Sequence, residues 1–305
     1  MKAQLKAPFP YFGGKSRIAE TVWRALGDVR NYVEPFCGSA VVLLARPDYD
    51  PTRHAETIND ADGFVVNFWR AVQWAPEETA KYADWPVNEA DLIARNDWLF
   101  AQKQLLLNRL RSDPEWFDAK IAGWWCWGMC CWVAGRFCNE TIKTARKPRL
   151  AGIGVGINAI VAPNIYDWFA ALSQRLRRVR VVCGDWQRVV TPAVLWYGKV
   201  TTGILLDPPY GDGAKCDRQV YSRYDASVSS AVRQWCLEHG DNPNYRIVLC
   251  GYEGEGHEVL EQHGWQKVAW KASGGYANKR RPGESLNRYR ERLWLSPGCA
   301  GKLFA

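Results

Sequence analysis

The sequence predicts an α/β fold with a mainly parallel sheet, a C-terminal antiparallel hairpin and a mostly helical insertion. Short apolar segments with strand character alternate with amphipathic helical segments in both halves of the chain. This alternation is typical of a parallel sheet covered by helices. The rhythm stops at about residue 75 and resumes after residue 162. Two alternating segments, 265–273 and 290–296, close the chain and fit a hairpin.

The first elements follow one another as strand, turn, helix, strand and helix. We expect a short strand at Tyr32–Glu34, a tight turn at Cys37–Ala40 and then a helix start. The segment "AETIND" (residues 55–60) is predicted as a second strand. Residues 61–74 follow it with apolar side chains at helical spacing, which predicts an amphipathic helix.

The middle of the chain has a different character. Residues 88–110 predict a long helix, with Asn88 as its N-cap. A tryptophan-rich segment (123–135) and a basic, glycine-rich loop (143–156) follow. We therefore predict one domain from residues 1–74 and 163–305, with residues 75–162 as an inserted subdomain.

Sheet elements return in the second half. We expect a helix at 163–178, strands at 179–186 and 203–210, a helix at 226–240 and a strand at 245–254. Strands that alternate with helices in this way pair in parallel.

The composition is that of an ordinary globular protein with a basic surplus. The 305 residues are 47% hydrophobic and 24% charged, and the formal net charge is +8. A surplus of this size suits a polyanionic partner. No apolar run is long enough to cross a bilayer, and the start "MKAQ" resembles no signal peptide. We therefore expect a cytoplasmic protein whose ten cysteines are reduced thiols.

Four of these cysteines gather in "CWGMCCWVAGRFC", at Cys126, Cys130, Cys131 and Cys138. Zinc sites usually carry paired Cys-x-x-Cys ligands with a matching partner pair. Because two of these cysteines are adjacent and no such pairs occur, we expect buried structural thiols and no metal.

The turn after the first strand has the features of a nucleoside site. Glu34 is followed by the small residues of "PFCGSA" and a helix start, as in nucleotide-binding sheets. Asp60 ends the next strand, at a spacing that suits an acid accepting both hydroxyls of a ribose. The turn lacks a lysine-serine phosphate loop, which favours a nucleoside cofactor without phosphate. An ordinary structural turn remains the alternative.

The segment "DPPY" at the end of a buried strand suggests recognition of an amine. Asp207 and the Pro208 carbonyl offer two acceptors at one point, which matches the two N–H donors of an exocyclic amine. Tyr210 can stack on the base that carries this amine. Parallel strands would bring Glu34, Asp60, Asp185 and Asp207 to the same sheet edge. A strand-ending turn with a core tyrosine is the structural alternative.

Five segments in this order, "YFGGK", "EPFCGSA", "IND", "CGDW" and "DPPY", resemble the Dam-like (D12 class) DNA adenine-N6 methyltransferases. Among these the chain is most similar to bacteriophage and prophage members. The resemblance runs from Pro8 to about Pro297 and is weakest across 75–160. It implies a Rossmann-like methyltransferase fold that uses S-adenosylmethionine, with an inserted target-recognition subdomain. It also implies DNA methylation of the kind found in restriction-modification.

The resemblance also implies roles for single residues. Asp60 would accept the ribose hydroxyls, and Asp185 the adenine amino group of the cofactor. The catalytic set would be Asp207, Pro208 and Tyr210, which hold and stack the target adenine. The family turn usually ends in glycine where this chain has Ala40. The implied cofactor-binding residues are Tyr11, Gly13, Gly14, Lys15, Glu34, Phe36, Gly38, Asp60, Asp185 and Asp207.

Duplex DNA would contact basic loops, because clustered lysine and arginine form the electrostatic footprint of phosphate binding. Solvated surface loops are the alternative. The clustered tryptophans are expected to form the core of the insertion. We expect a monomer or weak dimer. The predicted DNA-binding residues are Arg136, Asn139, Lys143, Arg146, Lys147, Arg149, Lys279, Arg280, Arg281 and Arg288.

Two rival functions stay open at this point. The same acceptor pair would suit cytosine N4 or an amine of RNA. A catalytically silent DNA-binding protein could keep the fold, although its "DPPY" would then be free to change. The recognition sequence and the biological role are not readable from these residues.

Overall fold

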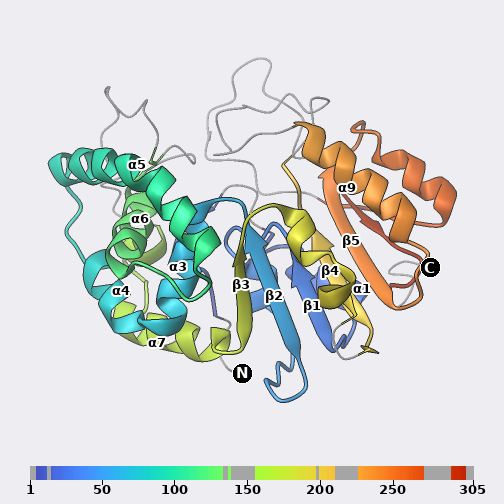
Figure 1. Ribbon diagram of the computed structural model, residues 1–305, viewed down its shortest axis with the longest axis horizontal. Helices are drawn as coiled ribbons and strands as arrows, with labels where there is room; N and C mark the ends of the chain where they lie inside the picture. The colour runs from blue at the N-terminus through green and yellow to red at the C-terminus, as the bar shows by residue number, and fades with distance from the viewer. Residues whose placement is uncertain are drawn as a thin grey trace. The chain divides into compact units, whose positions relative to one another are not determined.

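One sheet of seven strands, in the order β3-β2-β1-β4-β5-β7-β6, is formed by the residues that the structure describes (Figure 1). This computed structural model describes residues 5–11, 15–132, 137–138, 155–196, 199–209, 226–270 and 290–299. The strands are β1 (Asn31–Glu34), β2 (Ala55–Asp60), β3 (Val179–Cys183), β4 (Thr202–Leu206), β5 (Tyr245–Tyr252), β6 (Gln266–Ala269) and β7 (Glu291–Leu295).

The pairing confirms a mainly parallel sheet with an antiparallel C-terminal hairpin. β1 is parallel to β2 and β4, and β4 is parallel to β5. β7 is antiparallel to both β5 and β6. Every residue of β1 and β4 is buried, as expected of central strands covered on both faces. This topology agrees with the Rossmann-like methyltransferase fold that the resemblance implies.

The strand order reverses between β1 and β4. The chain continues from β1 to β2 and β3 on one side, and then returns to β4 on the other side of β1. Open α/β sheets bind ligands at the carboxyl ends of the strands next to such a switch point. Glu34 ends β1 and Asp207 follows β4 directly, so both lie at this point of the sheet.

Helices connect and cover the strands. The α-helices are α1 (Ala19–Leu26), α2 (Val41–Leu44), α3 (Gly63–Trp74), α4 (Pro76–Ala83), α5 (Glu89–Ser112), α6 (Ala119–Cys131), α7 (Ile165–Leu176), α8 (Pro192–Leu195) and α9 (Ala226–His239). Within the described residues, the 3-10 helices include η2 (Gly156–Asn158), η3 (Trp186–Val189) and η5 (His257–His263). The predicted insertion, 75–162, thus contains α4, α5, α6 and η2, and its domain boundaries stay a prediction.

Local chemistry explains where several elements begin and end. Asn88 caps α5 as predicted, since its side chain accepts from the Asp91 N–H at 2.7 Å. Asp62 caps α3 by accepting from the Phe64 N–H at 2.9 Å, so this helix starts two residues after the predicted position. β4 ends at Leu206 because Pro208 and Pro209 supply no ladder donors.

The contacts divide the chain into two compact units. The first unit comprises residues 1–14, 38–44 and 59–185. The second comprises residues 15–37, 45–58 and 186–305. None of the described helices has the length and apolar character that crossing a membrane requires.

Aromatic rings form the core of the first unit. The ring of Phe9 lies 5.0 Å from that of Phe68 and 4.8 Å from that of Trp125. Trp125 and Trp127 are buried, which confirms that these tryptophans of the insertion belong to the core. Large aromatic side chains in edge-to-face contact supply much of the burial energy of such a core.

The clustered cysteines are buried free thiols, as predicted. Cys126, Cys130, Cys131 and Cys138 are all buried and unpaired to one another by disulfides. Burial raises the pKa of Cys131 to about 12 and that of Cys138 well above the ordinary thiol value. The thiols of Cys131 and Cys138 therefore stay protonated at neutral pH and act as small apolar side chains.

Candidate active site

The turn after β1 is built around a glycine that allows close packing. Gly38 has a φ of 44°, and a Cβ there would lie 2.5 Å from an atom of the Tyr11 ring. The Gly38 N–H donates to Asp60 Oδ2 at 2.9 Å, and its carbonyl accepts from Trp69 Nε1 at 2.9 Å. The predicted cofactor residues Tyr11, Gly38 and Asp60 are thus in contact around one turn.

Ala40 has a φ of 46°, in the left-handed region that favours glycine. The backbone conformation at this position therefore favours glycine, the residue that the family usually has there. We expect Ala40→Gly to stabilise the fold by up to about 1 kcal/mol, because the strain of a left-handed alanine disappears. Urea denaturation measures the change.

A matched control is Ala71→Gly, at a buried position inside α3. Glycine there loses helix propensity, so we expect a loss of about 1 kcal/mol. Equal destabilisation of both variants would contradict the strain at Ala40.

Asp60 is a half-buried acid whose carboxylate accepts hydrogen bonds from backbone N–H groups. Its two carboxylate oxygens accept from the N–H groups of Gly38 and Asp62, each at 2.9 Å. Burial, and after it the charge of Asp62, raise the pKa of Asp60 to about 7, against the lowering effect of the backbone donors. Each carboxylate oxygen has a second lone pair that a ligand hydroxyl can use.

Asp185 follows β3 and is exposed. The residue before it is tied to the end of β2 twice. The Gly184 N–H donates to the Asp60 carbonyl at 3.0 Å, and Asn59 Nδ2 donates to the Gly184 carbonyl at 3.1 Å. These two bonds hold the loop that carries Asp185 beside the end of β2.

The second unit contains an aromatic pair, of which the sequence interpretation named Phe36 but missed Trp186. The half-buried Phe36 stacks on Trp186, with ring centroids 6.1 Å apart. Trp186 also meets Trp235 of α9 edge to face. The signal was present in "CGDW", because Trp186 follows Asp185 directly, but only the acid was selected there.

At the end of β4, Asp207 forms a buried ion pair. Lys15 Nζ lies 2.8 Å from Asp207 Oδ2, and the two side chains are 5% and 21% exposed. Pro208 is buried and Pro209 half-buried. The predicted acid and the predicted rigid proline backbone thus lie at the switch point of the sheet.

The charges around this pair act on both groups. Burial opposes the charge of Lys15, but Asp207, Cys250 and Glu291 together raise the pKa of this lysine above its ordinary value. Burial raises the pKa of Asp207, Lys15 lowers it, and Glu255 adds to the increase. Cys250, Glu255 and Glu291 come from the C-terminal part of the sheet and were absent from the predicted site.

Glu34 is buried at the end of β1. Its Oε2 accepts from the Tyr32 hydroxyl at 3.0 Å. Burial, and after it the charge of Glu34, raise the pKa of Tyr32 well above its usual value. Tyr32 therefore stays a neutral donor that helps to accommodate a buried carboxylate.

Several predicted site residues lie outside the described residues. These are Gly13 and Gly14 of the cofactor set, Tyr210 of the catalytic set, and the DNA-binding residues Arg136, Asn139, Lys143, Arg146, Lys147, Arg149, Lys279, Arg280, Arg281 and Arg288. Their roles stay predictions.

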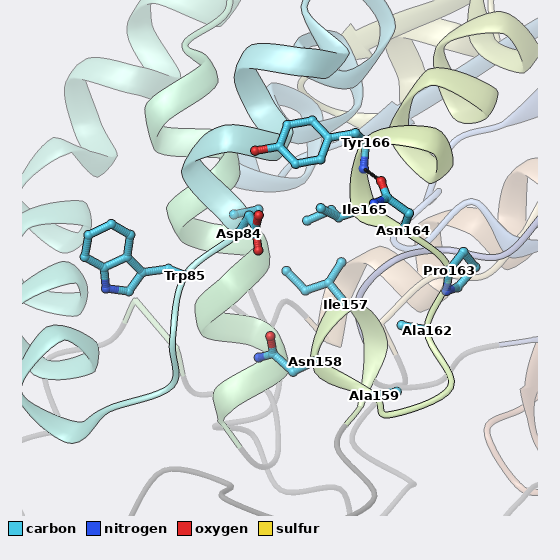
Figure 2. A pocket seen from close by; sticks show the side chains of 11 residues that line it. Asp84, Trp85, Ile157, Asn158, Ala159, Ala162, Pro163, Asn164, Ile165 and Tyr166 are labelled. Carbon is cyan, nitrogen blue, oxygen red and sulfur yellow. Dashed lines mark hydrogen bonds between the residues drawn. The ribbon is translucent and has the colours of Figure 1, made fainter.

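A shallow cavity of about 240 Å³ lies elsewhere in the first unit (Figure 2). Asp84 and Trp85 line it from the segment after α4, Asn158 from η2, and Asn164 and Tyr166 from the start of α7. No residue of the predicted cofactor, catalytic or DNA-binding sets lines this cavity. We assign it no part in the candidate active site.

Comparison with known families supports the resemblance over the first three of the five segments. Comparison with curated proteins gives no match. A family model does match the N-terminal third of the chain. The matched segment includes Tyr11, Lys15, Glu34 and Asp60, whereas "CGDW" and "DPPY" lie beyond its end. Residues 11–109 of the chain match the model of the D12 class N6 adenine-specific DNA methyltransferase family.

Proposed function

We propose that the protein transfers a methyl group from S-adenosylmethionine to the N6 amine of a flipped-out adenine in DNA. The observation that carries this proposal is the buried acid at the switch point. Asp207 follows β4 next to two prolines and is held at 2.8 Å by Lys15. An acid and a rigid carbonyl at this place suit a substrate that offers two N–H donors.

The residues around the first turn fit the cofactor. Asp60 keeps two acceptor lone pairs for the ribose hydroxyls, and the exposed Asp185 can accept from the adenine amino group. Phe36, stacked on Trp186, offers an aromatic face to a purine. The described turn at residues 35–40 contains no lysine-serine phosphate-binding loop, which suits a cofactor without phosphate.

When bound, S-adenosylmethionine supplies an electrophilic methyl group on a positively charged sulfur. The N6 amine is a poor nucleophile because its lone pair is delocalised into the adenine ring. Asp207 and the Pro208 carbonyl would accept its two N–H bonds, which favours a pyramidal nitrogen with an available lone pair. In the transfer, the N–C bond would form as the S–C bond breaks with its electron pair left on sulfur, and one N–H proton would pass to solvent water. Tyr210 would offset part of the few kcal/mol that flipping the base costs.

We propose double-stranded DNA as the partner because the chain carries a formal charge of +8. Phosphate contacts of this kind weaken steeply with salt. Binding to a mixed-sequence duplex is thus expected to fall as the salt concentration rises.

A methyl-transfer assay tests the proposal directly. The purified protein is incubated with radiolabelled S-adenosylmethionine and mixed-sequence duplex DNA, and the nucleosides are then separated. We expect label in N6-methyladenine. Asp207→Ala is expected to lower the rate by at least about 10²–10³-fold, as for loss of one group that stabilises a transition state.

Asp241→Asn is the matched control, since it changes an exposed acid of the same unit. It is expected to leave the rate unchanged. Label in N4-methylcytosine would keep the chemistry and overturn the base. Cofactor binding without label in DNA or RNA would replace the proposal by a silent DNA-binding protein.

A further inference from the structure

We propose that Lys15 is a positioning residue that keeps the Asp207 carboxylate ionised and directs its second oxygen to the substrate amine. This inference rests on the proposed function and deepens it. The resemblance places Lys15 in the lip of the cofactor pocket. The geometry points instead to a partner of the catalytic acid.

The contact itself is short and protected. Lys15 Nζ lies 2.8 Å from Asp207 Oδ2, and the lysine side chain is only 5% exposed. An ammonium buried to this degree needs a charged partner, because desolvation of an isolated charge is costly. Since Lys15 binds Oδ2, Oδ1 is the oxygen that we assign to the amine.

Lys15 is held in place by its neighbours in the chain. It lies just before α1 (Ala19–Leu26), and its carbonyl accepts from the Ile18 N–H at 3.0 Å. Val22, Trp23 and Leu26 of α1 are buried and anchor this helix. The ammonium is therefore presented from a fixed backbone rather than from a free surface side chain.

The charged and titratable groups that face the pair come from several strands. Glu255 after β5 faces Asp207, and Glu291 of β7 faces Lys15. Cys250 of β5 faces both, but burial and the charge of Asp207 raise its pKa well above the ordinary value, so it stays neutral. The cation of Lys15 thus opposes the burial of Asp207 and the charge of Glu255.

The consequence is a shift in the pH dependence of methyl transfer. A protonated Asp207 would donate a hydrogen bond where the amine needs an acceptor. An opposite charge at this distance lowers the pKa of a carboxyl group by about 1–3 units. Without Lys15, the acid side of the pH–rate profile should therefore move to higher pH by about 1–3 units.

The test compares Lys15→Gln, Lys15→Arg and the wild-type protein. The specificity constant kcat/KM for duplex DNA is measured from about pH 5 to about pH 9 at saturating S-adenosylmethionine. Cofactor affinity is measured separately by calorimetry. We expect Lys15→Gln to shift the acid limb upward and to change cofactor affinity less than about threefold, because the lysine binds the acid and not the cofactor. Lys15→Arg keeps the charge and should restore the wild-type profile.

Lys81→Gln, at an exposed position of α4, is the matched control and should leave the profile unchanged. An unshifted acid limb in Lys15→Gln would overturn the inference, and so would a large loss of cofactor affinity. If Lys15→Gln fails to fold, Lys15→Arg still tests the inference. A pH–rate profile of Lys15→Arg that differs from wild type would contradict a role for the positive charge. A wild-type protein without any methyl transfer would instead overturn the proposed function.

Discussion

Asp60→Asn is expected to weaken binding of S-adenosylmethionine at least about 10-fold at pH 8, because one hydrogen bond to a charged acceptor, worth about 1.5 kcal/mol or more, is lost. Asp60 is the acid that we assign to the ribose hydroxyls, and asparagine can accept from only one of them in the same geometry. Calorimetric titration of cofactor into each protein measures the difference.

The pH dependence of the wild-type protein follows from the same residue. The pKa of Asp60 is raised to about 7 by burial and by Asp62. Binding of the ribose needs the ionised carboxylate, so affinity for the cofactor should rise with pH up to about 7 and then level off. Below that value each pH unit should lower affinity about tenfold. The Asp60→Asn protein should lack this dependence.

Stability of the free protein should show the opposite trend. The folded state holds a proton on Asp60 that the unfolded chain releases near its ordinary pKa. The contribution of Asp60 to the free energy of unfolding is therefore highest below that ordinary value and falls as the pH rises to about 7. We expect this fall to be on the order of 1–2 kcal/mol for a half-buried group, and to be absent in Asp60→Asn.

Denaturant unfolding at several pH values measures this trend, with Asp84→Asn as the control for an exposed acid of the same unit. Parallel stability curves for wild type and Asp60→Asn would show that Asp60 keeps an ordinary pKa. A cofactor affinity unchanged in Asp60→Asn would remove the residue from the cofactor site.

Asp207→Ala is expected to destabilise the fold by about 3–5 kcal/mol, because it leaves the buried ammonium of Lys15 without its partner. The pair in the wild-type protein raises the pKa of Lys15. Its contribution to stability is thus present at neutral pH and is lost only as the pH rises through that raised value. In Asp207→Ala the buried lysine should lose its proton more readily, so the stability of this variant should rise with pH.

The double variant Lys15→Met with Asp207→Ala supplies the control. Removing both charges should recover much of the lost stability, since no unpaired buried charge remains. Urea denaturation of the wild-type protein, Lys15→Met, Asp207→Ala and the double variant gives the coupling energy between the two side chains. Additive losses in the double variant would mean that the pair makes no net contribution.

The fold was predictable because its signals are local. Residues 55–60 are predicted as a strand and form β2 with these bounds, since the β-branched Thr57 and Ile58 favour a strand and the polar Asn59 and Asp60 follow them. Asn88 caps α5 as predicted because capping depends only on the next three residues. The order of β6 and β7 was not predictable. β7 pairs with β5, and this choice depends on contacts between strands distant in sequence.

The site divides in the same way. The sequence alone selected the candidate site residues, namely Asp60, Asp185 and the acid of "DPPY", because each follows a strand in a recognisable short pattern. Only the tertiary structure decided their partners. It paired Lys15 with Asp207 across 192 positions of the chain, stacked Phe36 on Trp186 and gave Ala40 a left-handed backbone. Charge pairing, ring stacking and backbone strain depend on distances in space, which spacing along the chain does not specify.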